Sequence, residues 1–234
     1  MPQLIFLPGL ACNAVMWHHQ VMVVPPAFAP QVTDVHTRAA TVEVMASTLL
    51  DERPGELILC GASMGGMLAM EVARQAKPGR IRGLALLGTN ARPETLEMRK
   101  LREAAIPMFE QGRAEEVLKF NLPMAFHKSR VSDAVLLKTY LDFVLAAGPL
   151  QLVQQNRAVM ARPDARQHLP RVACPTLVLC GDSDQLTPPE CSHEIAALIP
   201  QAELHIIPDC GHMLTMERPA EVNATLLAWL SRLE

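Results

Sequence analysis

The segment Leu57-Ile58-Leu59-Cys60-Gly61-Ala62-Ser63-Met64-Gly65-Gly66-Met67 decides the fold, because a strand pattern passes directly into a helical one at Ser63. The apolar run 57–60 is typical of a strand with both faces covered. A serine at so sharp a turn has strained backbone dihedrals, and its neighbours two positions away must lack bulk. Gly61 and Gly65 meet that requirement. The pattern therefore favours an exposed, reactive serine over one that only caps a helix.

Short apolar runs bounded by turn residues recur along the chain and alternate with helical patterns. The predicted strands are Gln3–Leu7, Gln31–His36, Glu56–Cys60, Arg82–Leu87, Thr176–Cys180 and Glu203–Ile207. The predicted helices between and after them are Thr41–Leu50, Met64–Gln75, Pro189–Leu198 and Ala220–Arg232. This alternation predicts an α/β fold with an open, doubly wound, mainly parallel sheet of six strands that has helices on both faces.

One long stretch interrupts the alternation. Residues 91–171 contain no convincing strand and have helical periodicity in Pro93–Gln111, Arg113–Leu122, Ser132–Ala147 and Leu150–Ala161. Because a structureless loop of that length is rare in a compact domain, we expect a helical insertion. The predicted organisation is a core of residues 1–90 and 172–234 with a helical cap of residues 91–171.

The predicted cap is rich in aromatic and basic residues. Five of the nine aromatic side chains fall in it, namely Phe109, Phe120, Phe126, Tyr140 and Phe143. Residues 91–166 hold 12 Lys and Arg against 9 Asp and Glu. One interpretation is that small helices use aromatic residues to build a core of their own. The other is an apolar lid over a pocket with some affinity for anionic substrates, for which the candidate pocket residues are Phe126, Arg130, Tyr140 and Phe143.

A serine hydroxyl needs a histidine to take its proton and a carboxylate to orient that histidine. Among eight histidines, His212 lies in the loop that leaves the last predicted strand, so it emerges on the same rim of the sheet as Ser63. His127, in the predicted cap, is the other histidine worth testing. Asp182 and Asp184 both follow the fifth predicted strand, and either can supply the carboxylate.

Acyl transfer also needs two N–H donors aimed at the oxygen that becomes negative in the transition state. The amide of Met64, directly after the serine, is one candidate. The amide of Leu10, in the loop after the first predicted strand, is the other, because Gly9 allows a close backbone approach.

Composition excludes several classes of protein. Half of the residues are apolar and 19% are charged, which is enough apolar material for a buried core. The net charge of −3 disfavours a nucleic-acid partner. Apolar runs are shorter than the roughly 18 residues of a membrane span, and no basic segment precedes the first one, so a cytoplasmic protein is expected. The six cysteines are interpreted as small buried residues, with no structural metal and no cofactor. The oligomeric state is not predicted.

Three motifs resemble those of the α/β-hydrolase superfamily: Gly61–Gly66, Gly181–Pro188 and Gly211-His212. The resemblance covers nearly the whole chain and implies a catalytic triad of Ser63, Asp184 and His212. It also implies a helical cap and an all-parallel sheet of order 2-1-3-4-5-6. Pro8-Gly9 stands where the family often has His-Gly, and the chain begins at the strand that carries this loop. The cap and the Cys174–Val178 entry most resemble the carboxylesterase and enol-lactone hydrolase branch.

The expected function is a cofactor-independent serine hydrolase that cleaves a small ester, thioester or lactone through an acyl-enzyme. The alternative on the same triad is a C–C bond hydrolase or a cofactor-free lyase. A third possibility is a ligand receptor, because the superfamily includes hormone-sensing members that keep a triad.

Overall fold

The computed structural model describes residues 2–233 and contains one six-stranded parallel sheet. Its strands are β1 (Gln3–Leu7), β2 (Gln31–Val32), β3 (Leu57–Ala62), β4 (Ile81–Leu87), β5 (Thr176–Gly181) and β6 (Ala202–Ile207). They lie in the order β2-β1-β3-β4-β5-β6, and every neighbouring pair is parallel. The predicted fold class and strand order are therefore confirmed.

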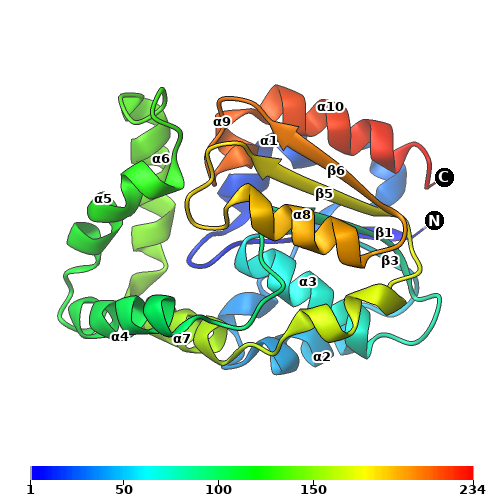
Figure 1. Cartoon of the computed structure of the whole chain (residues 1–234), viewed down its shortest axis with the longest axis horizontal. Helices are drawn as coiled ribbons and strands as arrows, with labels where there is room; N and C mark the ends of the chain where they lie inside the picture. Colours follow the sequence, from blue (N-terminus) through cyan, green and yellow to red (C-terminus); the bar gives the residue numbers. More distant parts are fainter. Residues whose placement is uncertain (1, 234) are drawn as a thin grey trace.

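Helices cover both faces of the sheet, as the alternation in the strands requires (Figure 1). In β1, Ile5 and Leu7 point into the apolar layer that contains α2 (Val42–Glu52), α3 (Met64–Gln75) and α8 (Pro189–Leu198). Leu4 and Phe6 point into the opposite layer, which contains Trp17 and α10 (Pro219–Leu230). The remaining short helices of this part are α1 (His18–Val21), α9 (Leu214–Glu217), η1 (Ala14–Trp17), η2 (Pro26–Phe28) and η3 (Val35–Thr37).

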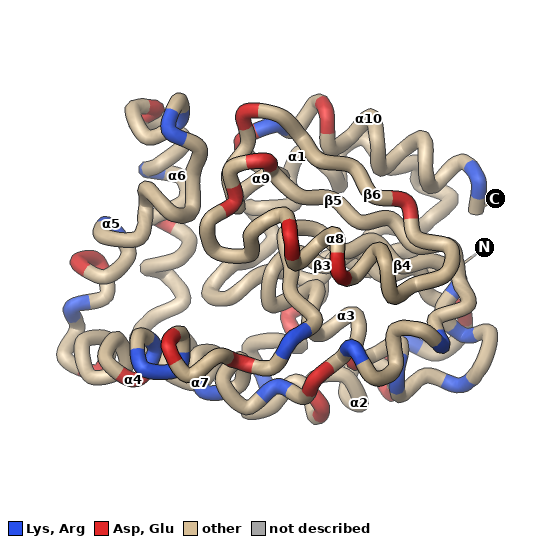
Figure 2. Tube along the Cα trace, viewed as in Figure 1, with Lys and Arg blue, Asp and Glu red and all other residues tan. Residues whose placement is uncertain are grey.

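The chain between β4 and β5 is helical. It contains α4 (Leu96–Glu110), α5 (Ala114–Ala125), α6 (Ala134–Ala146) and α7 (Gly148–Ala161), followed by the short turns η4 (Ala165–Gln167) and η5 (Leu169–Arg171). We call residues 91–171 the helical segment. Figure 1 shows the arrowheads of β5 and β6 pointing toward α5 and α6, so these two helices stand beside the carboxyl ends of the strands. Acidic and basic residues both occur along α4, whereas Arg157 is the one charged residue of α7 (Figure 2).

A buried ionic cluster fixes the base of the helical segment. The Glu94 carboxylate contacts Arg102 Nε at 2.6 Å and Arg162 Nη1 at 3.1 Å. Arg162 also donates from Nε to the carbonyl of Arg92 at 2.9 Å. Since a buried charge without its partner is costly, this cluster ties α4 and the end of α7 to the chain that leaves β4.

The second strand is shorter than the sequence predicts. The sequence predicts an extended Gln31–His36, but β2 contains only Gln31 and Val32, and the last hydrogen bond to β1 runs from the amide of Thr33 to the carbonyl of Phe6 at 3.0 Å. The Thr33 hydroxyl oxygen then accepts a hydrogen bond from the amide of Val35 at 3.2 Å, and η3 begins. Such a local side-chain hydrogen bond competes with the ladder, which ends this edge strand early.

Within residues 2–233 no single helix has the length and apolar content of a membrane span, although α6 and α7 together pass that test across an 88° bend.

Candidate active site

Ser63 occupies a strained turn between β3 and α3. Its backbone has φ 54° and ψ −119°, a combination that residues other than glycine rarely adopt. A Cβ on Gly61 would overlap the carbonyl of Gly65, and a Cβ on Gly65 would overlap the carbonyl of Leu7. The two glycines are therefore required for the close packing of strand, helix and the loop after β1, as the sequence predicts.

The sheet fixes the position of Ser63. Its amide donates to the carbonyl of Leu87 at the end of β4 at 2.9 Å, and its carbonyl accepts from the Thr89 hydroxyl at 2.7 Å. Ala62 and Met64 are buried, whereas Ser63 is only half-buried. The hydroxyl-bearing residue of the turn is thus the accessible one.

Asp184 and His212 contact each other at the carboxyl ends of β5 and β6. His212 Nδ1 lies 2.8 Å from Asp184 Oδ2, and both side chains are buried. The other Asp184 oxygen accepts from the amides of Leu186 and Thr187, each at 2.9 Å, and the Thr187 hydroxyl donates to Oδ2 at 2.9 Å. Every oxygen of this buried carboxylate therefore has a partner, and Nδ1 of the imidazole is oriented toward it.

The electrostatics of this pair favour a charged carboxylate beside a basic imidazole. Burial by itself would lower the pKa of His212, but the charge of Asp184 and its hydrogen bond outweigh burial and raise that pKa above its ordinary value. Burial would raise the pKa of Asp184, but the charge of His212 and the hydrogen bonds from His212 and Thr187 lower it. An imidazole of this kind accepts a proton readily and returns it.

The residue pattern allows either Asp182 or Asp184 as the partner of the histidine. In the structure the carboxylate that contacts His212 is that of Asp184. The Asp182 carboxylate accepts instead from the amides of Asp209 at 3.0 Å and Cys210 at 3.2 Å, which joins the loop after β5 to the loop after β6. Gly88, with φ 47°, follows β4 at the same rim, and a Cβ there would lie 3.2 Å from Asp184 Oδ2 and 3.5 Å from His212 Nδ1.

The loop after β1 runs beside Ser63. A Cβ on Gly9 would lie 3.5 Å from the Cβ of Ser63, so the residue that follows, Leu10, is close to the serine. Within residues 2–233 the amide of Leu10 donates no hydrogen bond. Met64 is the first residue of α3, where an amide has no intrahelical acceptor. The donor roles of Leu10 and Met64 stay predictions.

The helical segment contacts the loop that carries His212. The carbonyl of Ala125, at the end of α5, accepts from the amides of His212 at 3.0 Å and Met213 at 3.2 Å. The buried Glu217 carboxylate accepts from the amide of His127 at 2.8 Å and from that of Gly211 at 3.1 Å. Burial raises the pKa of Glu217 although these amides oppose the shift. Glu217 is not predicted from the sequence; its one signal is an acid that directly follows the mainly apolar segment Met213–Met216.

Three of the four candidate pocket residues form one aromatic cluster. The ring centroid of Tyr140 lies 5.1 Å from that of Phe126 and 5.6 Å from that of Phe143, both in edge-on contacts. Burial raises the pKa of the Tyr140 phenol, which favours its neutral form further. The fourth candidate, Arg130, pairs with Asp133 at 3.2 Å. His127 Nδ1 lies 2.7 Å from the Ser129 hydroxyl, so this second candidate histidine pairs within its own turn.

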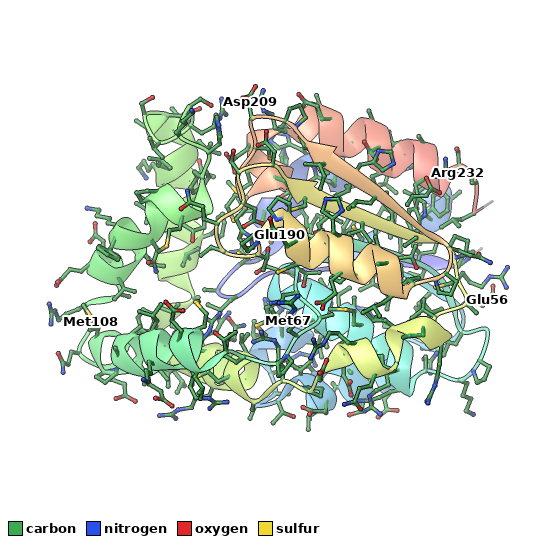
Figure 3. All side chains as sticks on the ribbon, in the orientation of Figure 1. Glu56, Met67, Met108, Glu190, Asp209 and Arg232 are labelled. Atoms are coloured by element: carbon green, nitrogen blue, oxygen red, sulfur yellow. The ribbon has the colours of Figure 1, made fainter. Side chains whose placement is uncertain are left out.

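The loops that carry these side chains lie on one side of the core. In Figure 3, Asp209, Glu190 and Met67 mark the side that faces α5 and α6, whereas Glu56 and Arg232 mark the opposite end. An open parallel sheet with an accessible serine at a strained strand–helix turn and an Asp–His pair on the neighbouring strand ends defines the class of α/β hydrolases.

The sequence agrees with this class. The family described as "Alpha/beta hydrolase family" matches residues 4–225, so the chain belongs to that family and is an enzyme. It is 24% identical, over 94% of its length and 92% of the relative's, to a pimeloyl-[acyl-carrier protein] methyl ester esterase of Nitrosomonas europaea.

Two solved structures are similar over nearly the whole chain. A thermophilic esterase from Thermogutta terrifontis has a TM-score of 0.88 and 27% identity, covering 100% of this chain and 90% of that one. The enol-lactonase from Burkholderia xenovorans LB400 has a TM-score of 0.84 and 23% identity, covering 99% and 92%. The expected resemblance to this superfamily is confirmed.

Proposed function

We propose that this hydrolase cleaves a small carboxylic ester through an acyl-enzyme on Ser63, with His212 as the base and Asp184 as the group that orients it. The observation that carries the proposal is the 2.8 Å contact between His212 Nδ1 and Asp184, on the rim where Ser63 occupies its strained turn. Because Asp184 engages Nδ1, the second ring nitrogen, Nε2, is the one available to Ser63.

The reaction then follows in two steps. As Ser63 Oγ bonds to the carbonyl carbon, its proton passes to His212 Nε2, and the amides of Leu10 and Met64 stabilise the oxygen that becomes negative. The carbonyl re-forms when the alkoxide leaves with the proton from His212. Water, deprotonated by His212, then attacks the acyl carbon, and the bond to Ser63 Oγ breaks as His212 returns the proton to that oxygen, which releases the acid and regenerates Ser63.

The helical segment supplies the substrate pocket in this proposal. Residues 91–171 act as a cap, and the cluster of Phe126, Tyr140 and Phe143 forms an apolar wall for the acyl or alcohol group. Arg130 is a less favoured pocket residue, since its guanidinium pairs with Asp133. The names of similar proteins support an ester or lactone as the substrate class: one relative is named as a methyl ester esterase, one solved structure as an esterase and another as an enol-lactonase.

The test is hydrolysis of p-nitrophenyl butyrate by the Ser63→Ala variant. We expect kcat to fall by at least about 10⁴-fold, the scale seen when a triad member is removed. Ser47→Ala, at an exposed serine of α2, is the matched control and should keep the wild-type rate. Near-normal turnover by Ser63→Ala would refute the proposal. A panel of esters, thioesters, lactones and β-diketones then identifies the bond cleaved, and turnover of the β-diketone alone would favour the C–C bond hydrolase.

A further inference from the structure

A buried glutamine of the helical segment contacts the loop after β1. Gln155 lies on α7 and has no exposed surface. Its Oε1 accepts from the amide of Ala11 at 2.6 Å, and its Nε2 donates to the carbonyl of His36 at 2.9 Å. Both ends of the side-chain amide are therefore used to join α7 to two loops at the edge of the sheet.

The loop that Gln155 contacts is a strained turn. The amide of Cys12 donates to the carbonyl of Gly9 at 3.1 Å, which makes residues 9–12 a β-turn with Ala11 as its third residue. Ala11 has φ 56°, a left-handed conformation that this position requires in a type II turn and that glycine adopts far more easily than alanine. The turn thus contains a residue whose own preference opposes its conformation.

Two contacts oppose the relaxation of this turn. Gln155 holds the Ala11 amide, and the ring of buried His36 donates from Nε2 to the carbonyl of Cys12 at 2.9 Å. Relaxing Ala11 to a right-handed conformation rotates the Leu10–Ala11 peptide, because that peptide lies between the two dihedrals that would change. The Ala11 N–H would then leave Gln155 Oε1 without its donor, and the adjoining Gly9–Leu10 peptide, which carries the Leu10 N–H, would no longer be bordered by a fixed peptide.

We propose that Gln155 is a positioning residue for the reaction: it holds the turn in its strained form and thereby keeps the amide of Leu10 at the oxyanion. This inference rests on the proposed function, in which Leu10 is an oxyanion donor. Since Gln155 belongs to the helical segment, it also makes the geometry of the oxyanion site depend on the position of α7.

The experiment compares Gln155→Met, which keeps an unbranched side chain of similar size, with Gln154→Met on the same helix. Within residues 2–233 Gln154 makes no side-chain hydrogen bond, so its variant is the matched control. Two readouts are taken: kcat and KM on p-nitrophenyl butyrate, and the rate at which a fluorophosphonate labels Ser63, located by mass spectrometry. In that labelling Ser63 Oγ bonds to phosphorus, fluoride leaves, and His212 takes the proton.

For Gln155→Met we expect kcat and the labelling rate to fall by about tenfold with little change in KM, and Gln154→Met to match the wild type. Adding Ala11→Gly to Gln155→Met should recover most of the loss, because glycine accepts the left-handed conformation without support. If Gln155 served only stability, Gln155→Met would lower the thermal midpoint of unfolding, and adding Ala11→Gly would not restore kcat or the labelling rate.

The outcomes separate this inference from the function on which it rests. If the wild type is labelled at Ser63 and Gln155→Met is labelled equally fast, the positioning role is wrong while the proposed function stands. If the wild type is not labelled at Ser63, both fail. If Gln155→Met does not fold, the double variant Ala11→Gly/Gln155→Met is compared with Ala11→Gly. A gap of less than about threefold supports the role. A larger gap, or a double variant that also fails to fold, overturns it.

Discussion

The turn that carries Ser63 and the loop that carries His212 lie on the same rim, but different parts of the molecule hold them. Ser63 is fixed by the end of β4, through Leu87 and Thr89. The amide of His212 instead donates to Ala125 of the helical segment. The position of the nucleophile is therefore fixed by the sheet and the residues that directly follow β4, whereas the position of the base also depends on a region outside the sheet.

The largest expected effect comes from breaking the orientation of the base. Asp184→Asn presents an amide where His212 Nδ1 now meets a carboxylate, so it favours the wrong tautomer and removes the charge that stabilises imidazolium. We expect kcat to fall by about 10⁴-fold while the protein stays folded, as measured by ester hydrolysis and circular dichroism. Asp182→Asn is the matched control: it should lose far less, because Asp182 accepts from loop amides and does not contact His212. Equal losses in the two variants would contradict the assignment.

A smaller effect is expected where the base meets the helical segment. Glu217→Gln leaves one acceptor for the two amides of His127 and Gly211, so one of them loses its partner. We expect the free energy of unfolding to fall by about 1–3 kcal/mol and kcat by about 3- to 10-fold. Urea unfolding and steady-state kinetics measure the two. Glu221→Gln, at an exposed site on α10, should change neither. A stability loss with unchanged kcat would mean that this contact supports the fold but not the base.

The smallest effect is a shift of the pH profile. Catalysis needs neutral His212, and its pKa is raised above the ordinary 6.5, so kcat/KM should rise with pH and reach half of its plateau above pH 6.5. The stabilising contribution of protonated His212 has the opposite sign: it is fully present below the unfolded pKa and is lost as pH rises through the folded one. Glu217→Gln removes a negative charge near His212 and should move the midpoint of activity to lower pH. A wild-type midpoint below 6.5 would contradict the raised pKa.

The fold was predictable because its local signals agree with one another. The helix after Ser63, Met64–Gln75, has the bounds that the pattern predicts, and so does Pro189–Leu198. The largest difference is at β2, where the amide of Thr33 makes the last hydrogen bond to β1 and its side chain then binds the amide of Val35. An edge strand has a neighbour on one side only, so a single such contact is enough to end it.

The candidate site was predictable in part. The sheet rule places the loops that carry Ser63, Asp184 and His212 on one rim, but the residue pattern could not separate Asp184 from Asp182, because both side chains leave the same strand end. The family resemblance implies Asp184, and the contact between its carboxylate and His212 distinguishes the two directly. Gln155 was not predicted, since its partner Ala11 is 144 positions away and such pairs leave no local pattern. Its one signal is a run of amide residues, 154–156, between apolar positions of α7.

Two of the attachments of the helical segment have unequal consequences for protein engineering by recombination. Glu217 binds a main-chain amide, which any foreign insert supplies if its backbone passes the same point. Gln155 binds through its side chain, so an insert grafted from another hydrolase would have to carry glutamine at that position. A chimera that lacks this glutamine would be expected to fold and expose a reactive serine, yet turn over slowly until Ala11→Gly is added.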